Sequence, residues 1–381
     1  MIFYGEQNVY EAAKDRLRFI FNEFYPHRKI GVTFSGGKDS TVTLFLTKEI
    51  MDEFGIEKIP VIFLDQEAET PQTIEYVREI MNLPWVEPYW IQTHFQEWNA
   101  SKGEWFNVWG PGEKWCREKE PNNPYTDLPL GNMQFFKKTL GKIQHYVLGD
   151  DYISLGGVRI EESPSRLSGL TQGNVYKGIT WGKNNKVGLA LYPIWDWKSN
   201  DVWYYIFSKK VPYCKLYNYL FTKHPLIKCR VSSCIHEQSI QNLSFLKEIS
   251  PEFWTKLYKR VENVNTSLHT LRDMTSYVSE LPPYFVSWKE YIEYLAVNLC
   301  GTEKSAQSVI KSYEYHINHW KRIFGNYEEG IEFLTNLISK YTAKCIVSED
   351  FELKGVENKS IMLNKYYNNN YTKIVKANKE E

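Results

Sequence analysis

Apolar residues in the first third of the chain recur with two different spacings, one typical of helices and one of buried strands. Residues 7–25 and 39–54 each place their apolar side chains on one helical face. Three short apolar runs predict buried strands: residues 30–34, 59–64 and 86–91. Strands that alternate with helices predict an α/β fold with a doubly wound, mainly parallel sheet. In such sheets, ligands bind at the carboxyl ends of the strands, near the point where the strand order reverses.

The apolar spacing changes near residues 279–283, where two consecutive prolines interrupt the chain. Residues 287–341 again carry apolar side chains at helical spacing, whereas the sequence from residue 348 on is polar and rich in Asn, Tyr and Lys. We therefore expect an α/β domain with a C-terminal helical extension, divided as residues 1–245, 246–350 and a flexible polar tail over 351–381.

The composition of the 381-residue chain limits the classes of function. Basic and acidic residues number 46 each, so binding of a polyanion over a broad surface is not indicated. Lysine, histidine and aromatic residues interleave over residues 311–322. Two interpretations of this segment stay open: a local surface that binds nucleic acid or a partner protein, and the more common solvated face of a helix. No apolar run reaches membrane-spanning length, the N-terminus lacks the apolar segment of a signal peptide, and the six cysteines do not form a disulfide framework. A cytoplasmic protein that does not bind membranes is expected.

The segment Ser35-Gly36-Gly37-Lys38-Asp39-Ser40 joins the first strand to the next helix and is the main candidate for chemistry. Its two glycines allow the backbone to turn sharply and to approach a ligand closely. The helix that follows points its free N–H groups and its positive dipole end at the loop, and Lys38 adds a positive charge. Phosphate is the ligand that this arrangement favours. The segment is not an ordinary P-loop, because Val32 stands where that motif requires its first glycine.

The six residues of this loop resemble the pyrophosphate loop, or PP-loop, of the adenine nucleotide α-hydrolase superfamily. That group includes ATP pyrophosphatases, ATP sulfurylase small subunits and the sulfonucleotide reductases that act on PAPS or APS. The resemblance implies that the loop binds the phosphates of an adenine nucleotide, either ATP or PAPS. In the superfamily the second strand ends in an Asp and then a Glu-Thr pair near the adenosine, and Asp65, Glu69 and Thr70 stand at those positions here.

Two further segments narrow the resemblance to the reductase branch. Gly157, Arg159 and Arg166 match the pattern Gly-x-Arg-x-x-x-Ser-x-x-Arg of that branch. Because the planar guanidinium of arginine matches phosphate and sulfate, the resemblance implies an anion site here, and an exposed loop with solvated arginines is the alternative. Residues 193–203 carry a second hallmark, Pro-x-x-Asp-Trp-x-x-x-Asp-Val-Trp, which reductases and sulfurylases share.

Residues 1–245 as a whole resemble PAPS reductase-like proteins, in particular a longer subgroup typified by immunoglobulin-binding regulator A. Members of that subgroup often accompany a ParB/sulfiredoxin-like protein. The resemblance therefore implies such a protein as a candidate partner. The C-terminal helical part of the chain is similar to the subgroup only in its place after the first domain and in its helical character.

Cys234 is the candidate for thiol chemistry. Cys234-Ile235-His236 partly matches the Glu-Cys-Gly-Ile/Leu-His tail whose cysteine attacks the sulfonucleotide in reductases. Three interpretations compete, in this order of preference: ordinary packing, a catalytic thiol, and a metal site formed by Cys229, Cys234 and His236. The segment around Cys116 has one cysteine where APS-type enzymes have a pair, so an iron–sulfur cluster is not expected.

These features predict an enzyme that acts at the α-phosphate of ATP and either adenylates a substrate or releases AMP and pyrophosphate. Lys38 and the loop amides would stabilise the charge that develops on the phosphates, and Asp39 or Asp65 would bind an assisting Mg²⁺. Lys38, Asp39 and Cys234 are accordingly the catalytic candidates. The alternatives are reduction of PAPS or APS by Cys234, and a catalytically silent nucleotide-binding regulator that works with a ParB-like partner.

Overall fold

The computed structural model divides the chain into two compact units, Met1–Leu268 and His269–Glu381. The residues that the structure describes are 3–4, 7–99, 104–131, 135–171, 173–185, 187–222, 229–236, 243–261, 281–283, 285–300, 302–324, 332, 335–336, 338–339 and 342–343. The expected polar tail over 351–381 lies outside the described residues.

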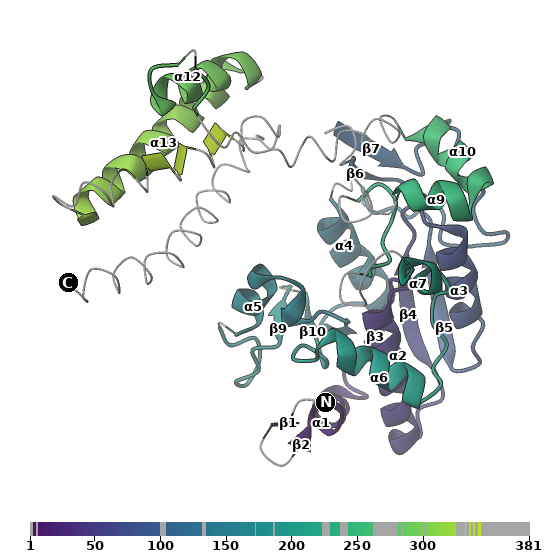
Figure 1. The fold of residues 1–381 in the computed structure, drawn as a ribbon. Helices are drawn as coiled ribbons and strands as arrows, with labels where there is room; N and C mark the ends of the chain where they lie inside the picture. Colours follow the sequence, from purple (N-terminus) through teal and green to yellow (C-terminus); the bar gives the residue numbers. More distant parts are fainter. Residues whose placement is uncertain are drawn as a thin grey trace. The chain divides into compact units, whose positions relative to one another are not determined.

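The first unit is built around a six-stranded sheet with the order β5-β4-β3-β8-β10-β9 (Figure 1). All neighbouring strands are parallel except β9, which pairs antiparallel with β10. The strands span Ile30–Thr33 (β3), Ile59–Leu64 (β4), Val86–Ile91 (β5), Tyr152–Leu155 (β8), Gly182–Asn184 (β9) and Gly188–Leu191 (β10). The mainly parallel sheet expected from the apolar runs is confirmed.

The strand order reverses at one place in this sheet. From β3 the chain moves outward to β4 and then β5, and it returns to the other side of β3 to add β8 and β10. The carboxyl ends of β3 and β8 therefore flank the topological switch point, where doubly wound sheets bind their ligands.

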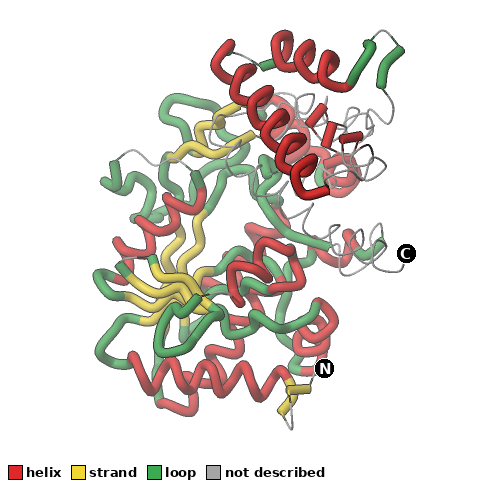
Figure 2. Tube along the Cα trace, turned by 90° about the vertical axis from the view of Figure 1, so that its left-hand side faces the viewer, coloured by secondary structure: helices red, strands yellow, loops and turns green. Residues whose placement is uncertain are grey.

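Helices and short hairpins complete the first unit (Figures 1 and 2). The helices span Val9–Phe24 (α1), Lys38–Phe54 (α2), Pro71–Met81 (α3), Phe136–Leu148 (α4), Pro164–Thr171 (α5), Ser199–Ser208 (α6), Leu216–Leu220 (α7), Leu243–Ile249 (α9) and Pro251–Arg260 (α10), with a short 3₁₀ turn at Ile160–Glu162 (η1). The hairpins pair β1 (Phe3–Tyr4) with β2 (Gln7–Asn8) and β6 (Phe95–Asn99) with β7 (Glu104–Val108).

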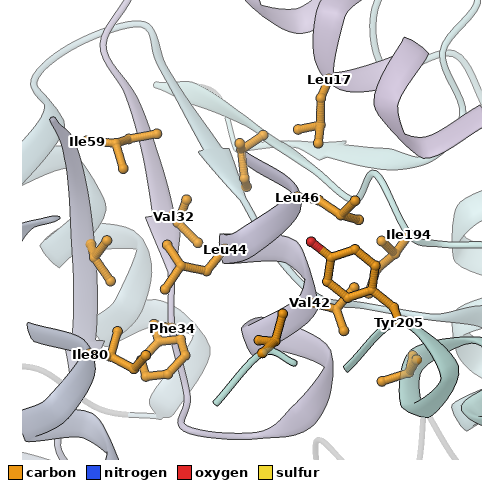
Figure 3. Packing of buried hydrophobic residues seen from close by; sticks show 14 of the residues in the cluster. Leu17, Val32, Phe34, Val42, Leu44, Leu46, Ile59, Ile80, Ile194 and Tyr205 are labelled. Carbon is orange, nitrogen blue, oxygen red and sulfur yellow. The ribbon is translucent and has the colours of Figure 1, made fainter. Parts of the chain in front are cut away.

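Alternate residues of the central strands face opposite sides of the sheet, as the two-residue period of a strand requires. One side carries the large apolar core, in which Val32 of β3 lies beside Leu44 of α2, while Leu46 lies nearer Ile194 and Tyr205 (Figure 3). The opposite side faces α4. There the Nε2 atom of Gln144 donates hydrogen bonds to Thr33 Oγ1 at 2.9 Å and Ser154 Oγ at 2.8 Å. Polar side chains from β3 and β8 thus meet on the α4 side, beside the switch point.

The second unit contains two long helices, α12 (Trp288–Leu299) and α13 (Glu303–Phe324). Apolar side chains at helical spacing form its core, including Ile292 and Leu295 of α12 and Val309 of α13. The expectation of C-terminal helices is confirmed for these two elements. None of the described helices is long and apolar enough to cross a membrane.

The structural division falls after Leu268, so α9 and α10 belong to the first unit. Arg260 at the end of α10 forms an ion pair with the fully buried Glu67, with 2.7 Å between Arg260 Nε and Glu67 Oε1. The boundary expected at residue 245 falls inside α9 and would place α10 in the helical domain. The three-part division stays a prediction.

Candidate functional site

The loop between β3 and α2 has the backbone geometry that its glycines allow. Gly36 has a φ of +73°, and a Cβ atom there would lie 3.0 Å from Thr73 Cγ2 of α3. Gly37 is the N-cap residue of α2 and has no side chain that could cap the helix, and in the first turn the Lys38 N–H donates to the Tyr217 hydroxyl at 3.0 Å. The hydroxyls of Ser35 and Ser40 lie 3.1 Å apart and form a hydrogen bond that joins the two ends of the turn. The sharp turn expected from the sequence therefore ends at a helix N-terminus without an N-cap side chain, which favours an anion.

Three charged side chains lie together at the first turn of α2. Lys38 Nζ donates to Asp39 Oδ2 at 3.0 Å, and Arg159 Nε donates to Asp39 Oδ1 at 2.6 Å. Lys38 and Arg159 are each only 3% exposed. Burial by itself would raise the pKa of Asp39, but the positive charges of Lys38 and Arg159 outweigh it and hold the pKa below its usual value. Asp39 therefore stays ionised and fixes both cations.

Gly157 brings the turn after β8 into direct contact with α2. A Cβ atom on Gly157 would lie 2.5 Å from the carbonyl carbon of Asp39 and 2.6 Å from Ser40 N. Real Cβ atoms do not approach backbone atoms so closely, so glycine is required for this contact. The resemblance placed Gly157 in the nucleotide site, and the structure places it against the loop helix.

A cavity of about 320 Å³ opens at the carboxyl ends of β3, β8 and β10. Its volume falls within the range of about 300–1,000 Å³ that ligand pockets occupy. The sequence-predicted residues that line it are Ser35, Gly37, Lys38, Asp39, Ser40, Gly157 and Arg166. The cavity lies at the switch point of the sheet and ends at the first turn of α2, which is where a doubly wound protein is expected to bind its ligand.

Two arginines line this cavity in addition to Lys38, and the sequence pattern pointed to only one of them. Arg166 of α5 pairs with Glu162, and Arg230 donates from Nη2 to the carbonyl oxygen of Glu162 at 3.3 Å. Both guanidinium groups thus contact Glu162, and burial together with the charge of Arg230 lowers the pKa of Arg166. The sequence pattern did not indicate Arg230, because the motif in its segment is one of cysteines.

Arg159 takes a different position from Arg166. It does not line the cavity but lies behind Asp39, where its Nη1 also donates to Glu161 Oε2 at 2.7 Å and to the Trp197 carbonyl oxygen at 3.1 Å. Its direct role as an anion ligand stays a prediction, and what the structure shows is a link between η1 and the first turn of α2.

The residues at the end of β4 do not line this cavity. Asp65 is fully buried, and its Oδ2 accepts hydrogen bonds from Trp90 Nε1 at 2.7 Å and Gln92 Nε2 at 2.9 Å and pairs with Arg117. Thr70 caps α3, because its Oγ1 accepts from Thr73 N at 3.2 Å. Glu69 lines a separate cavity of about 530 Å³. The structure thus separates these three residues from the loop, and their contact with adenosine stays a prediction.

Cys234 is buried beside the end of β4, where its backbone N–H donates to the Ala68 carbonyl oxygen at 2.9 Å. Burial, together with the nearby Glu69 and Cys116, raises the pKa of the Cys234 thiol well above its usual value. A nucleophilic cysteine needs the opposite shift, because the thiolate is the reactive form. In this environment the thiol stays protonated and packs as a small apolar group.

The expected magnesium ligands do not fit a resident metal ion. Both carboxylate oxygens of Asp39 already accept from Lys38 and Arg159, and Asp65 is saturated by buried donors. Within the ranges that the structure describes, no three His, Cys, Asp or Glu side chains are grouped as a metal site would require, and this includes Cys229, Cys234 and His236. Neither aspartate is therefore placed to hold a divalent cation by itself.

Together the fold and the site define a doubly wound α/β protein with a PP-loop at the switch point of its sheet. Residues 29–223 match the family described as the phosphoadenosine phosphosulfate reductase domain, and this chain belongs to that family. Residues 224–379 match a second family, described as a domain of unknown function (DUF3440). The family is one of nucleotide-binding proteins. The expected subgroup of immunoglobulin-binding regulator A is not confirmed by these matches.

The chain is also similar to proteins from bacteria and archaea. It is 27% identical over 333 residues to the uncharacterized protein YbdN of Escherichia coli, and the match covers 82% of this chain and 80% of YbdN. It is 27% identical over 266 residues to the uncharacterized protein MJ0066 of Methanocaldococcus jannaschii, with 69% of this chain and 47% of the relative covered. The match thus spans about half the length of the archaeal protein.

Two solved structures are similar in outline. FMN adenylyltransferase of Candida glabrata, in complex with FAD and inorganic pyrophosphate, is 15% identical with a TM-score of 0.38, and the match covers 57% of this chain and 64% of that chain. The PAPS reductase of Candida auris, a phosphate complex, is 15% identical with a TM-score of 0.31, and the match covers 57% of this chain and 93% of that chain.

Proposed function

We propose that this protein binds ATP in the cavity at the switch point and catalyses a reaction at the α-phosphate, either adenylating an acceptor or releasing AMP and pyrophosphate. One observation carries the proposal: the N-terminus of α2, Lys38 and the two arginines Arg166 and Arg230 all border one cavity. These three cations outnumber the carboxylates of Asp39 and Glu162 in the same lining, and an excess of positive charge in a concave site is what oligophosphate recognition needs.

Part of the cavity lining is suited to a nucleoside. Phe136 and Leu140 of α4 and Val158 add apolar surface to the cavity that the charged loop residues also line. A purine ring can pack on aromatic and aliphatic side chains while the phosphates extend toward α2. We place the adenine against α4 on this basis.

The reaction would require an acceptor oxygen to attack the α-phosphorus, so that a new P–O bond forms and the bond to the β-phosphate oxygen breaks. Negative charge then develops on pyrophosphate. The Lys38 ammonium and the dipole of α2 would stabilise that charge in place, since both are held before the nucleotide arrives. Mg²⁺ would enter with the nucleotide phosphates, as is usual for a cation that keeps most of its water ligands.

The same site supports two alternatives. The family match favours a sulfonucleotide substrate, and Cys234 would then be the nucleophile, although its burial keeps the thiol neutral in the structure. A regulator that binds nucleotide without turnover, together with a ParB/sulfiredoxin-like partner, is the other. Each alternative has its own product pattern.

Isothermal titration calorimetry with ATP and with PAPS tests the site. Lys38→Ala should weaken the binding of either nucleotide by roughly ten- to a hundredfold, the value of a charge-assisted hydrogen bond to phosphate. Lys48→Ala removes a lysine from the same helix but from a surface pair with Asp52, and should leave the affinity unchanged. Equal affinities for the two variants would contradict the proposed site.

Product analysis separates the three functions. AMP and pyrophosphate formed from ATP would support the proposed reaction. Sulfite formed from PAPS, and lost in Cys234→Ser, would support reduction instead. Tight nucleotide binding without any product would support the regulator. Loss of ATP turnover in Cys234→Ser with folding intact would speak against our proposal, which gives that thiol no chemical role.

A further inference from the structure

The cavity beside Glu69 is a second concave site in the first unit. Its volume is about 530 Å³, and it lies between the N-terminal turns of α3 and α10 and the segment that contains Cys116 and Arg117. None of the residues that line it also lines the cavity at the loop. Pro71, Ile74 and Phe253 give it an apolar wall. The size and lining are those of a site for a small organic molecule.

The polar part of the lining carries an excess of positive charge. Arg78, Arg117 and Lys256 lie at the cavity, against the carboxylate of Glu252 and that of Glu69. Arg78 pairs with Glu120 at 2.9 Å and Arg117 pairs with Asp65. Lys256 forms no ion pair or hydrogen bond with any part of the chain that the structure describes. A cation without a protein partner at the mouth of a cavity favours an anionic ligand.

The two helices add to this preference. α3 and α10 are 11 and 10 residues long, and both begin with a proline at the cavity. Proline has no backbone N–H, but at the first helical position that group would have no partner within the helix, so the positive end of the helix dipole is retained. The N-termini of both helices therefore lie at the same cavity as Lys256, and of the two only α10 lacks a side-chain cap, because Thr70 caps α3.

Glu69 is a buried polar residue in the lining of this cavity. It is 3% exposed, and among the described residues its carboxyl group makes no hydrogen bond and no ion pair. Burial and the negative charge of Asp65 raise the pKa of Glu69 to about 8, and the charge of Arg117 opposes this only in part. At neutral pH Glu69 is therefore protonated and can donate a hydrogen bond to an oxygen atom in the cavity.

We propose that this cavity is a second ligand site, distinct from the nucleotide site, which binds a small organic anion with an apolar body. The apolar body would pack against Ile74 and Phe253, and the acid group would lie near Lys256. Glu69 would donate its proton in a hydrogen bond to the ligand. No covalent step is involved.

The test uses 8-anilinonaphthalene-1-sulfonate as the probe, because it combines an aromatic body with an anionic group and fluoresces when it is bound in apolar surroundings. Lys256→Ala in the full chain should weaken probe binding by roughly fivefold, as expected for one partly exposed charge contact. Lys259→Ala makes the same change on the same helix but away from the cavity, and should have no effect. Equal effects of the two substitutions would overturn the proposal.

Raising the pH provides a second test. Above about pH 8 Glu69 loses its proton, so its negative charge should repel the probe and weaken binding between pH 7 and pH 9.5. Glu69→Gln keeps a donor but cannot ionise, and should bind the probe equally at both pH values. The other titratable or charged groups that face Glu69 are Asp65, Cys116, Arg117, Cys234, Arg78, Glu252 and Lys256. A pH dependence that persists in Glu69→Gln would assign it to one of them and contradict the role of Glu69.

Competition distinguishes the two sites. Saturating ATP should leave probe binding unchanged, and Lys38→Ala should lower ATP affinity while it leaves the probe affinity as it is. If ATP displaces the probe, the cavity belongs to the nucleotide site and the proposal of a second site fails, while the proposed nucleotide binding stands. Circular dichroism of each variant at both pH values verifies that the fold is intact.

Discussion

Gly157 and Asp39 show how the loop is held at the scale of single residues. Asp39 is fixed by two buried cations, and the absence of a side chain on Gly157 lets the turn after β8 touch the backbone of the same helical turn. Backbone contact of this kind is rigid, because no side chain can rotate to relieve a collision. The first turn of α2 is thereby positioned from two directions before any ligand binds.

Gly157→Ala is therefore expected to disturb the site directly. The new Cβ atom would meet Asp39 and Ser40 backbone atoms at 2.5–2.6 Å, and we expect a loss of about 1–3 kcal/mol in the free energy of unfolding together with weaker ATP binding. Urea denaturation and calorimetry measure the two effects. Gly141→Ala is the matched control, because nothing lies within 4 Å of its added Cβ atom and it stands inside α4. Gly141→Ala should raise the free energy of unfolding by about 0.5–1 kcal/mol. If Gly141→Ala lowered the stability and Gly157→Ala left it unchanged, the packing argument would be refuted.

Sequence patterns identified the residues of the loop but not all of their neighbours. Ser35 to Ser40 are contiguous, so their chemistry could be predicted from local order alone. Gln144 and Arg230 come from distant segments, and only the folded chain brings them to the cavity. Arg159 was predicted by its place in a motif, yet a motif does not give the direction of a side chain, and in the structure Arg159 points to Asp39.

Elements far apart in the sequence meet at the loop, and α7 illustrates this. The hydroxyl of Tyr217 accepts a hydrogen bond from the backbone N–H of Lys38 at 3.0 Å, so a short helix late in the domain holds the start of α2. Tyr217 is itself enclosed by Trp203 of α6, with ring centroids 5.0 Å apart. Aromatic residues of α6 and α7 therefore stabilise the first turn of the loop helix.

Tyr217→Phe removes one oxygen atom and leaves the buried Lys38 N–H without its partner. We expect a loss of about 1–2 kcal/mol in unfolding free energy, and faster hydrogen exchange of the Lys38 amide. Tyr213→Phe removes a hydroxyl that donates to Asn218 at an exposed position, so it should change stability by less than about 0.5 kcal/mol. Native-state exchange followed by NMR compares the two. Unchanged protection of Lys38 in Tyr217→Phe would show that α7 does not hold the loop.

The order of strands and helices was predictable because each element carries its own periodic signal. The buried strands β3, β4 and β5 are short runs of apolar residues, and α1 to α3 place apolar residues on one face. The contacts made by the residues at the end of β4 could not be predicted in the same way. Asp65 lies at a strand end like the loop, but no local pattern shows that the side chains of Trp90 in β5 and of Arg117 in an irregular segment meet its carboxylate.

The whole chain is divided differently in the structure and in the sequence pattern. The sequence analysis expects the first boundary at residue 245, whereas the compact unit of the structure extends to Leu268. The reason is a long-range contact. Glu67, which is fully buried, needs the guanidinium of Arg260, and that arginine lies in the part of the chain that matches the second family.

Two truncations test this division. A chain ending after residue 268 should unfold cooperatively in urea, because it keeps every described element of the first unit. A chain ending after residue 245 loses Arg260 and leaves the Glu67 carboxylate buried without its cation, which should cost about 3–5 kcal/mol or prevent folding. Arg260→Met in the longer fragment isolates the ion pair from the loss of helix packing. Two fragments of equal stability would place the boundary at residue 245 after all.

The burial of Lys38 has a consequence for chemical modification. Acylating reagents react with amines that are uncharged and reachable from solvent, and Lys38 is 3% exposed with its ammonium engaged by Asp39. Acetyl groups should therefore accumulate on surface lysines first, and the loop should keep its charge when most of the protein has been labelled. The rate at which Lys38 is acetylated, measured by mass spectrometry of the peptides, would then report how often the first turn of α2 opens.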